Sequence, residues 1–270
     1  MTQQSTPKKQ NIPQEEAALR QLYRLLQAAQ RICVFTGAGV SCPSGIPDFR
    51  SAKGIYSQRD GYTRTPEEMV SHEFFWAHPE EFYAFYRKKM VWPNARPNAF
   101  HRFAAALEER PGRRVTVVTQ NIDGLHQAAG STRVLELHGS VHRNRCTVCG
   151  AVCGLQAVTE STGLPRCPAC GGLLKPEVVL YGEQLDAPTV EAAVAAIADA
   201  ELVLVAGTSL AVYPAASFLR YCRGRLAVLN LTPTPVDARA DVAVYADAAQ
   251  AAEYLQAMAQ GDDAPPAGTR

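Results

Sequence analysis

Four short apolar runs along the chain have the pattern of buried β-strands. They are rich in branched and aromatic residues, each ends at a polar residue or a glycine, and they cover residues 31–37, 114–119, 200–207 and 225–230. Continuous apolar runs of this length are typical of parallel strands that are buried on both faces of a sheet. The pattern therefore predicts four strands of a parallel sheet.

Helical patterns alternate with these runs. Apolar residues recur at steps of three and four over residues 15–30, and helical segments also cover residues 98–110 and 189–200. This alternation predicts an α/β fold with a doubly wound, Rossmann-like parallel sheet. Ligands of such sheets bind beyond the carboxyl ends of the strands. We therefore expect the site where polar clusters follow the strands, at residues 36–39, 119–123, 207–209 and 230–232.

Two stretches interrupt the alternation. Residues 51–97 hold aromatic-rich helical segments, and residues 141–183 hold most of the cysteines. We interpret them as insertions that together build a smaller domain, a helical insertion plus a zinc ribbon. The larger domain then comprises residues 15–50, 98–140 and 184–258. Flexible tails are predicted at residues 1–14 and 259–270.

The composition is that of a globular protein and excludes several classes. The chain has 270 residues, 47% of them hydrophobic and 20% charged, with a formal net charge of +1. This balance does not point to a nucleic-acid partner. The apolar runs are too short to cross a membrane, and the polar N-terminus lacks the apolar core of a secretory signal. We therefore expect a cytoplasmic protein whose eight cysteines form no disulfide framework.

Two Cys-x-x-Cys pairs, separated by 17 residues, have the spacing of a zinc site: Cys146, Cys149, Cys167 and Cys170. Four protein thiolates leave zinc no open coordination position, so we predict a structural rather than a catalytic metal. Cys153 lies outside the paired pattern, although it could compete for the metal. Cys33 and Cys222 are expected to be ordinary core residues.

A glycine-rich turn follows the first predicted strand. Gly37, Ala38 and Gly39 resemble the start of a dinucleotide-binding fingerprint, but Cys42 occupies the position of its third glycine. Small residues here allow the backbone to approach a pyrophosphate, and a helix that starts near Ser44 would direct its amide dipoles toward the phosphates. By itself the turn is also consistent with a plain strand-to-loop connection.

A longer string that begins at this turn is far more specific. Residues 37–50 have the sequence Gly-Ala-Gly-Val-Ser-Cys-Pro-Ser-Gly-Ile-Pro-Asp-Phe-Arg, which resembles the signature of the sirtuins, the NAD-dependent protein deacylases. The resemblance covers roughly residues 31–249 and continues, in the family order, through residues 119–126, 137–140, the cysteine pairs, 175–183, 207–210 and 230–232. It implies removal of an acyl group from lysine with consumption of NAD, release of nicotinamide and formation of O-acyl-ADP-ribose.

The resemblance also implies roles for individual residues. His138 matches the catalytic histidine, whose neutral imidazole helps to deprotonate the ribose on the nicotinamide side. Asn121, also implied to act in catalysis, and Asp123 hold the nicotinamide nucleoside, while Phe49 covers the nicotinamide site. The implied NAD contacts are Gly37, Ala38, Gly39, Ser41, Asp48, Phe49, Arg50, Gln120, Asn121, Ile122, Asp123, His138, Gly207, Thr208, Ser209, Asn230, Leu231 and Ala248. The remaining histidines are expected to be core or surface residues: His72, His78, His101, His126 and His142.

The acyl-lysine peptide is the implied partner. It adds as a strand to the segment formed by Val178, Val179, Leu180, Tyr181 and Gly182. Sirtuins that are selective for succinyl- or malonyl-lysine carry a Tyr-x-x-Arg pair in the acyl pocket. Here Tyr83 matches the tyrosine, Tyr86 stands in place of the arginine, and Arg87 comes one residue late, about 100° further around a helix. We therefore expect uncharged acyl groups to be preferred over succinyl.

Three other functions remain open at this point. An ADP-ribosyltransferase would use the same NAD site to modify a protein nucleophile. A zinc-ribbon adaptor without catalysis would use basic residues near the cysteine pairs, such as Arg143, Arg145 and Arg166. A hydride-transferring dehydrogenase is disfavoured by Cys42 in the glycine motif.

Overall fold

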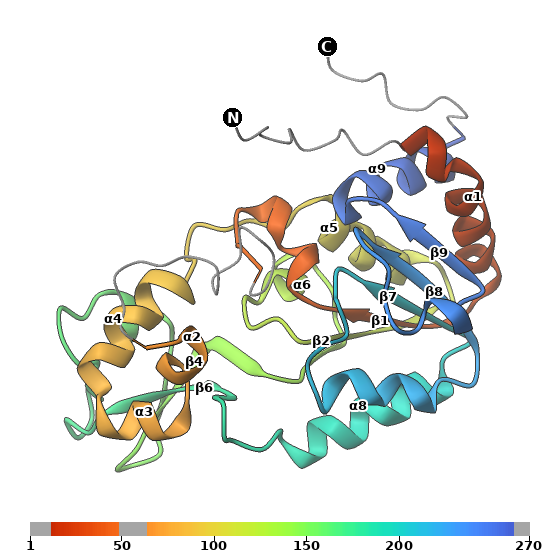
Figure 1. The fold of residues 1–270 in the computed structure, drawn as a ribbon. Coiled ribbons are helices and arrows are strands. Elements are labelled where there is room, and N and C mark those ends of the chain that lie inside the picture. The colour runs from red at the N-terminus through yellow and green to blue at the C-terminus, as the bar shows by residue number, and fades with distance from the viewer. Residues whose placement is uncertain (1–11, 49–63, 262–270) are drawn as a thin grey trace, which may run out of the picture.

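The larger part of the molecule is built on a six-stranded sheet (Figure 1). Residues 12–48 and 64–261 are described by a computed structural model. The strands, in spatial order, are β3 (Val134–Glu136), β2 (Arg114–Thr119), β1 (Arg31–Thr36), β7 (Leu202–Ala206), β8 (Arg225–Asn230) and β9 (Val242–Tyr245). All neighbouring pairs are parallel. The chain order reverses between β1 and β7, as the predicted doubly wound sheet requires.

The four predicted strands are confirmed as β1, β2, β7 and β8, whereas two edge strands escape the sequence pattern. β3 has three residues, all half-buried, and β9 has four residues of which alternate ones are buried. Strands this short, at the edges of a sheet, produce no continuous apolar run. They become visible only where they pair with β2 and β8.

Helices cover both faces of this sheet. One face carries α1 (Ile12–Ala28), α5 (Ala99–Ala106) and α9 (Ala248–Ala259), and the other carries α8 (Ala187–Asp199) and the 3₁₀ helix η5 (Ala215–Tyr221). In β1, Ile32 and Val34 pack on the first face, while Cys33 and Phe35 pack on the second. A strand buried on both sides has the continuous apolar run seen in the sequence.

The predicted helices are confirmed, but the one expected near Ser44 is wrong. Two 3₁₀ helices stand there instead, η1 (Ala38–Val40) and η2 (Cys42–Ser44), and Gly45 ends the second in a left-handed conformation. The remaining elements of this part are η4 (Leu107–Glu109), α6 (Leu125–Ala128) and η6 (Asp237–Arg239). No helix within the described ranges combines the length and the apolar character that a membrane span requires.

The smaller part contains a three-stranded antiparallel sheet and short helices (Figure 1). Its strands are β5 (Val152–Cys153), β4 (Gly139–Cys146) and β6 (Leu174–Val178), and its helices are α2 (Pro66–Met69), α3 (His72–Ala77), α4 (Pro79–Lys89) and α7 (Gln156–Thr159). One buried cluster combines Phe75 and Phe82 with Val141, Val158 and Leu180. Side chains from the two insertions therefore share a hydrophobic core.

Polar caps fix where several helices begin. At α2, α3, α5, α8 and α9 a side-chain oxygen of the residue before the helix accepts a hydrogen bond from a backbone N–H of the first turn. The accepting residues are Thr65, Ser71, Asn98, Asp186 and Asp247. Such caps satisfy amides that have no partner inside the helix. The cap of α9 matters most here because Asp247 and Ala248 also lie on the wall of the cavity described below.

Candidate active site

A cavity of about 990 Å³ lies at the carboxyl ends of β1, β2, β7 and β8 and extends to the smaller part. Among the predicted cofactor-site residues, those on its wall are Gly37, Ala38, Gly39, Ser41, Asp48, Gln120, Asn121, Ile122, Asp123, His138, Gly207, Thr208, Ser209, Asn230, Leu231 and Ala248. The predicted peptide segment, Val178 to Gly182, and Tyr86 also line it. Phe49 and Arg50 lie outside the described residues, and Tyr83 is not on the wall.

Glycines bring two loops into contact at the point where the strand order reverses. The Gly39 amide donates to the Gly207 carbonyl oxygen at 2.8 Å. A Cβ atom on Gly39 would lie 2.8 Å from the Gly207 Cα atom, and one on Gly207 would lie 2.4 Å from the Val40 nitrogen. Gly207 also has a φ of 59°, a conformation that other residues rarely adopt. Only glycine therefore permits this close approach beside the cavity.

Asn121, Ser41 and Asp123 form a connected polar network on the wall. The Asn121 side-chain amide donates to the Gly37 carbonyl and to Ser41 Oγ, both at 3.1 Å. Ser41 Oγ in turn donates to Asp123 Oδ2 at 2.7 Å. Burial raises the pKa of Asp123, against the opposing effect of bonds from Leu125 and Ser41. The network therefore fixes the amide of Asn121 and the carboxylate of Asp123 on the cavity wall.

His138 is held in one tautomer by the backbone. Its Nδ1 lies 2.9 Å from the Gln120 carbonyl oxygen, which can only accept, so Nδ1 carries the proton of the neutral ring. The lone pair of a general base is then on Nε2. Burial lowers the pKa of His138, although the bond to Gln120 opposes this effect. The imidazole is therefore neutral near pH 7 and able to accept a proton.

Helix α4 holds the two predicted acyl-pocket residues, Tyr83 and Tyr86, and the neighbouring Arg87 in different environments. Tyr86 is fully buried and lines the cavity. The hydroxyl of Tyr83 donates instead to the Leu174 carbonyl. Arg87 donates through Nε to the Val158 carbonyl at 2.9 Å and through Nη2 to Ser161 Oγ at 2.7 Å. Arg87 is thus bound to α7 and the residues just after it, away from the cavity wall.

Several cavity residues were absent from the sequence prediction. His142, expected to be an ordinary histidine, lines the cavity, and its Nε2 lies 3.0 Å from the Asp123 carbonyl oxygen. Asp247, Lys89 and Trp92 also lie on the wall. Asp247 stands immediately before the Ala-rich helical run of residues 248–259, and an aspartate at a helix start is a sequence signal that could have found it. Lys89 and Trp92 carry no such signal because their place depends on how α4 packs.

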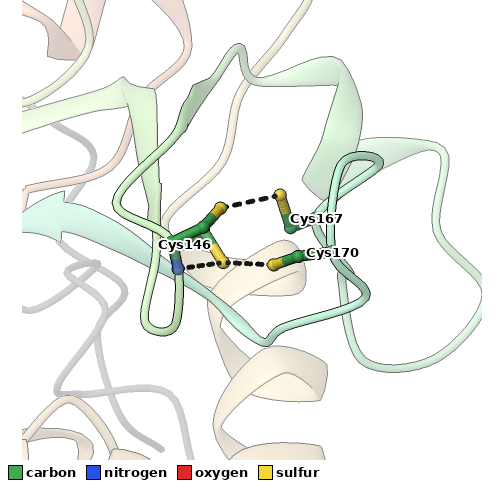
Figure 2. A group of neighbouring side chains, drawn as sticks. Cys146, Cys167 and Cys170 are labelled. Carbon is green, nitrogen blue, oxygen red and sulfur yellow. Dashed lines mark hydrogen bonds between the residues drawn. The ribbon is translucent and has the colours of Figure 1, made fainter.

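The cysteine pairs come together as the spacing predicts. The Sγ atoms of Cys146, Cys149, Cys167 and Cys170 all lie within 4.8 Å of one another, as Figure 2 illustrates for three labelled members. Tetrahedral zinc with bonds of about 2.3 Å needs sulfur atoms about 3.8 Å apart. The Sγ atoms of Cys146 and Cys170 are 3.4 Å apart, and those of Cys149 and Cys167 are 3.7 Å apart. Gly150 and Gly171, directly after the pairs, have φ values of 75° and 74°. The four thiols fit a zinc ion.

Comparison with known proteins identifies the family. The model of the Sir2 family matches residues 37–214. The NAD-dependent protein deacetylase of Cutibacterium acnes is 50% identical over 226 residues, which cover 83% of this chain and 92% of that protein. This chain belongs to the Sir2 family. A second relative of this sirtuin, the NAD-dependent protein deacetylase of Clostridium perfringens, is 47% identical over 228 residues, covering 84% and 93% of the two chains.

Solved structures agree with this assignment. A Sir2 protein bound to an acetylated peptide has a TM-score of 0.77 to this sirtuin at 34% identity, over 91% of this chain and 99% of that one. A Sir2 complex with a p53 peptide and NAD+ has a TM-score of 0.76 at 36% identity, with the same coverage. The sirtuin resemblance predicted from the motifs is therefore confirmed.

Proposed function

We propose that this sirtuin is an NAD-dependent protein-lysine deacetylase. The observation that carries the proposal is the single cavity on which the glycine turn, the Asn121–Asp123 network and the His138 imidazole meet. Relatives at 47% and 50% identity are named NAD-dependent protein deacetylases, and a neighbour in fold holds NAD+. NAD supplies the ADP-ribosyl group that accepts the acyl group as nicotinamide leaves.

Each part of the cavity has a task in this proposal. The glycine turns and the residues after β7 and β8 bind the phosphates and the adenosine half of NAD, since their small side chains let a pyrophosphate approach the backbone closely. Asn121 and Asp123 orient the nicotinamide nucleoside. Nε2 of neutral His138 accepts a ribose hydroxyl proton once the acyl oxygen has attacked the neighbouring carbon.

The peptide and the acyl group occupy the side of the cavity nearer the smaller part. Val178 to Gly182 pair with the peptide backbone, and Tyr86 belongs to the acyl pocket. Tyr83, predicted to share that pocket, instead packs behind the wall with its hydroxyl on the Leu174 carbonyl. We propose that acetyl and other uncharged acyl groups are preferred over succinyl. Arg87 is bound elsewhere, and a neutral Tyr86 cannot balance the charge of a desolvated carboxylate.

The proposal extends to the metal, the domains and the location. Cys146, Cys149, Cys167 and Cys170 bind one structural zinc, whose filled coordination shell keeps it out of the reaction. The smaller domain comprises residues 51–97, of which 51–63 lie outside the described residues, and residues 141–183. The protein acts in the cytoplasm.

One mass-spectrometric experiment tests the function. An acetyl-lysine peptide is incubated with the protein with and without NAD, and the masses of the peptide and of the NAD-derived product are measured. We expect loss of the acetyl group and formation of O-acetyl-ADP-ribose only with NAD. An ADP-ribosylated peptide or protein without O-acetyl-ADP-ribose would instead support the transferase alternative, and no NAD-dependent product would contradict both.

A further inference from the structure

The segment that follows β6 is fixed in place by one carboxylate. Oε2 of Glu183 accepts the Leu180 amide at 2.9 Å. Oε1 lies 2.9 Å from Nδ1 of His72 and 3.0 Å from Nζ of Lys175. We name these three side chains, Glu183, His72 and Lys175, the Glu183 cluster. It joins a residue of α3 and a residue of β6 to the end of the predicted peptide segment.

The backbone around the Glu183 cluster is tied at the same place. The Glu183 amide donates to the Leu180 carbonyl at 2.9 Å, which closes a turn through Gly182 at a φ of 87°. The His72 amide donates to the Tyr181 carbonyl at 2.8 Å, and the Tyr181 amide donates to the Val70 carbonyl at 3.1 Å. The segment therefore lies between the cavity and α3.

The other end of the same segment touches the catalytic histidine. The Val179 amide donates to the His138 carbonyl oxygen at 2.9 Å. This bond anchors the far end of the segment beside His138, so loss of the Glu183 contacts would free the Leu180 end and leave the His138 end attached. The Glu183 carboxylate is 18% exposed as a side chain, so solvent screens its ion pairs only in part.

Ionisation of Glu183 suits this task. Burial opposes the charged form, but bonds from His72, Leu180 and Lys175 outweigh it and hold the pKa of Glu183 below its ordinary value. A carboxylate with three donors from three parts of the chain makes charge-assisted bonds that are stronger than neutral ones. It can therefore reinforce the turn that the bond from the Glu183 amide to the Leu180 carbonyl closes.

We infer that Glu183 is a positioning residue that preforms the peptide-binding segment by joining it to His72 and Lys175. The inference rests on the proposed deacetylase function. Without the carboxylate, the peptide itself would have to order the segment when it binds. The free energy of that ordering would be subtracted from the binding free energy, so the affinity for the peptide would fall. The loss should fall on the peptide and not on NAD, because none of these contacts involves the glycine turns or the residues after β7 and β8.

Steady-state kinetics of Glu183→Gln, Glu183→Ala and His72→Ala test this inference, with an acetyl-lysine peptide and NAD each varied at saturation of the other. We expect Glu183→Gln to raise the peptide KM about threefold to tenfold, with kcat and the KM of NAD changed by less than about twofold. Glu183→Ala should have a larger effect, because glutamine can still accept the Leu180 amide. His72→Ala should have a smaller effect, and should add little to Glu183→Gln because the two residues share one contact.

Glu177→Gln is the matched control. Glu177 lies on β6, and its carboxylate binds Arg143 and Arg145 instead of the segment. The peptide KM of the Glu177→Gln variant should therefore stay unchanged. An unchanged peptide KM in Glu183→Gln, or an equal rise in the KM of NAD, would overturn the inference. A wild-type protein without NAD-dependent deacetylation would instead contradict the proposed function. Should Glu183→Ala fail to fold, the glutamine variant and His72→Ala still decide the question.

Discussion

His138 combines two properties that a general base needs, and both come from its immediate surroundings. The Gln120 carbonyl fixes the proton on Nδ1, and burial keeps the ring neutral. We predict that His138→Ala lowers kcat at least about 100-fold, the usual contribution of a positioned base, and leaves NAD affinity within about threefold. Turnover by mass spectrometry and NAD binding by calorimetry measure the two effects. Wild-type turnover in the variant would contradict the assigned role.

The rate of the reaction should depend on pH through the ionisation of His138. The protonated imidazole cannot accept a proton, so activity must fall as pH drops through the pKa of His138. Because burial lowers that pKa, the acid limb of kcat/KM should lie below about 6.5, the ordinary histidine value. A pH–rate profile between pH 4.5 and 8 measures it. An acid limb above pH 7 would show that another group limits the rate.

Tyr86 tests the acyl preference at the scale of one side chain. We predict that Tyr86→Arg raises the ratio of desuccinylation to deacetylation about tenfold or more, because the guanidinium would pair with the succinyl carboxylate. Rates with succinyl- and acetyl-lysine on the same peptide give the ratio. Tyr86→Phe, which adds no charge, is the control and should not raise it. A wild-type protein that prefers succinyl-lysine would mean that the Arg87 contacts with Val158 and Ser161 break in the complex.

At the scale of elements, the cysteine pairs sit in turns that connect the strands of the small sheet. Cys146 ends β4, and at this end of the small sheet the buried cluster among the described residues consists only of Cys146, Cys167 and Leu174, so a metal held by the four thiols would supply much of the local stability. We predict that Cys146→Ser releases the zinc and destabilises the protein by about 4 kcal/mol, the range typical of a lost structural metal. Elemental analysis and urea unfolding measure both effects.

Cys153 provides the control for the metal prediction. It packs beside Cys146 and Cys167 but is not one of the four thiols that meet. Cys153→Ser should therefore keep one zinc per chain. Full zinc in Cys146→Ser, or loss of zinc in Cys153→Ser, would refute the proposed ligand set.

At the scale of the whole molecule, two buried histidines link stability to pH. The rings of His101 and His126 are 4.8 Å apart, and each side chain is at most 1% exposed. Burial, with smaller contributions from Arg102 and from the neighbouring imidazole, lowers the pKa of His101 to about 4 and that of His126 to about 3. Below pH 6.5 the unfolded chain therefore binds protons that the folded protein does not.

Protonation of these two imidazoles in the unfolded chain should destabilise the folded protein in acid. Stability should be complete above about pH 6.5 and fall as pH decreases, by about 2 kcal/mol for each imidazole by pH 5. Urea unfolding at pH 7 and pH 5 measures the loss, which should be smaller in His101→Gln. His78→Gln, at a half-exposed surface position, should leave the pH dependence unchanged. An equal loss in His101→Gln would contradict the explanation.

Much of the fold and of the site can be predicted from the sequence, because local patterns indicate burial directly. A continuous apolar run marks a strand covered on both faces, as in β1 and β7, and its end marks the edge where ligands bind. The spacing of the cysteine pairs likewise predicts the four ligands of the metal site. The motifs around Gly37, Asn121 and His138 carry the chemistry, so the fold class, the family and the centre of the cavity could all be predicted.

Tertiary structure decided what depends on contacts between distant positions. No local pattern distinguishes Tyr86, which lines the cavity, from Tyr83, which binds the Leu174 carbonyl. The bond between His72 and Glu183 joins residues 111 positions apart, and β3 and β9 exist only through their neighbours in the sheet. Periodicity along the chain determines which side of an element is buried, but only the packing of elements determines which side chains meet there.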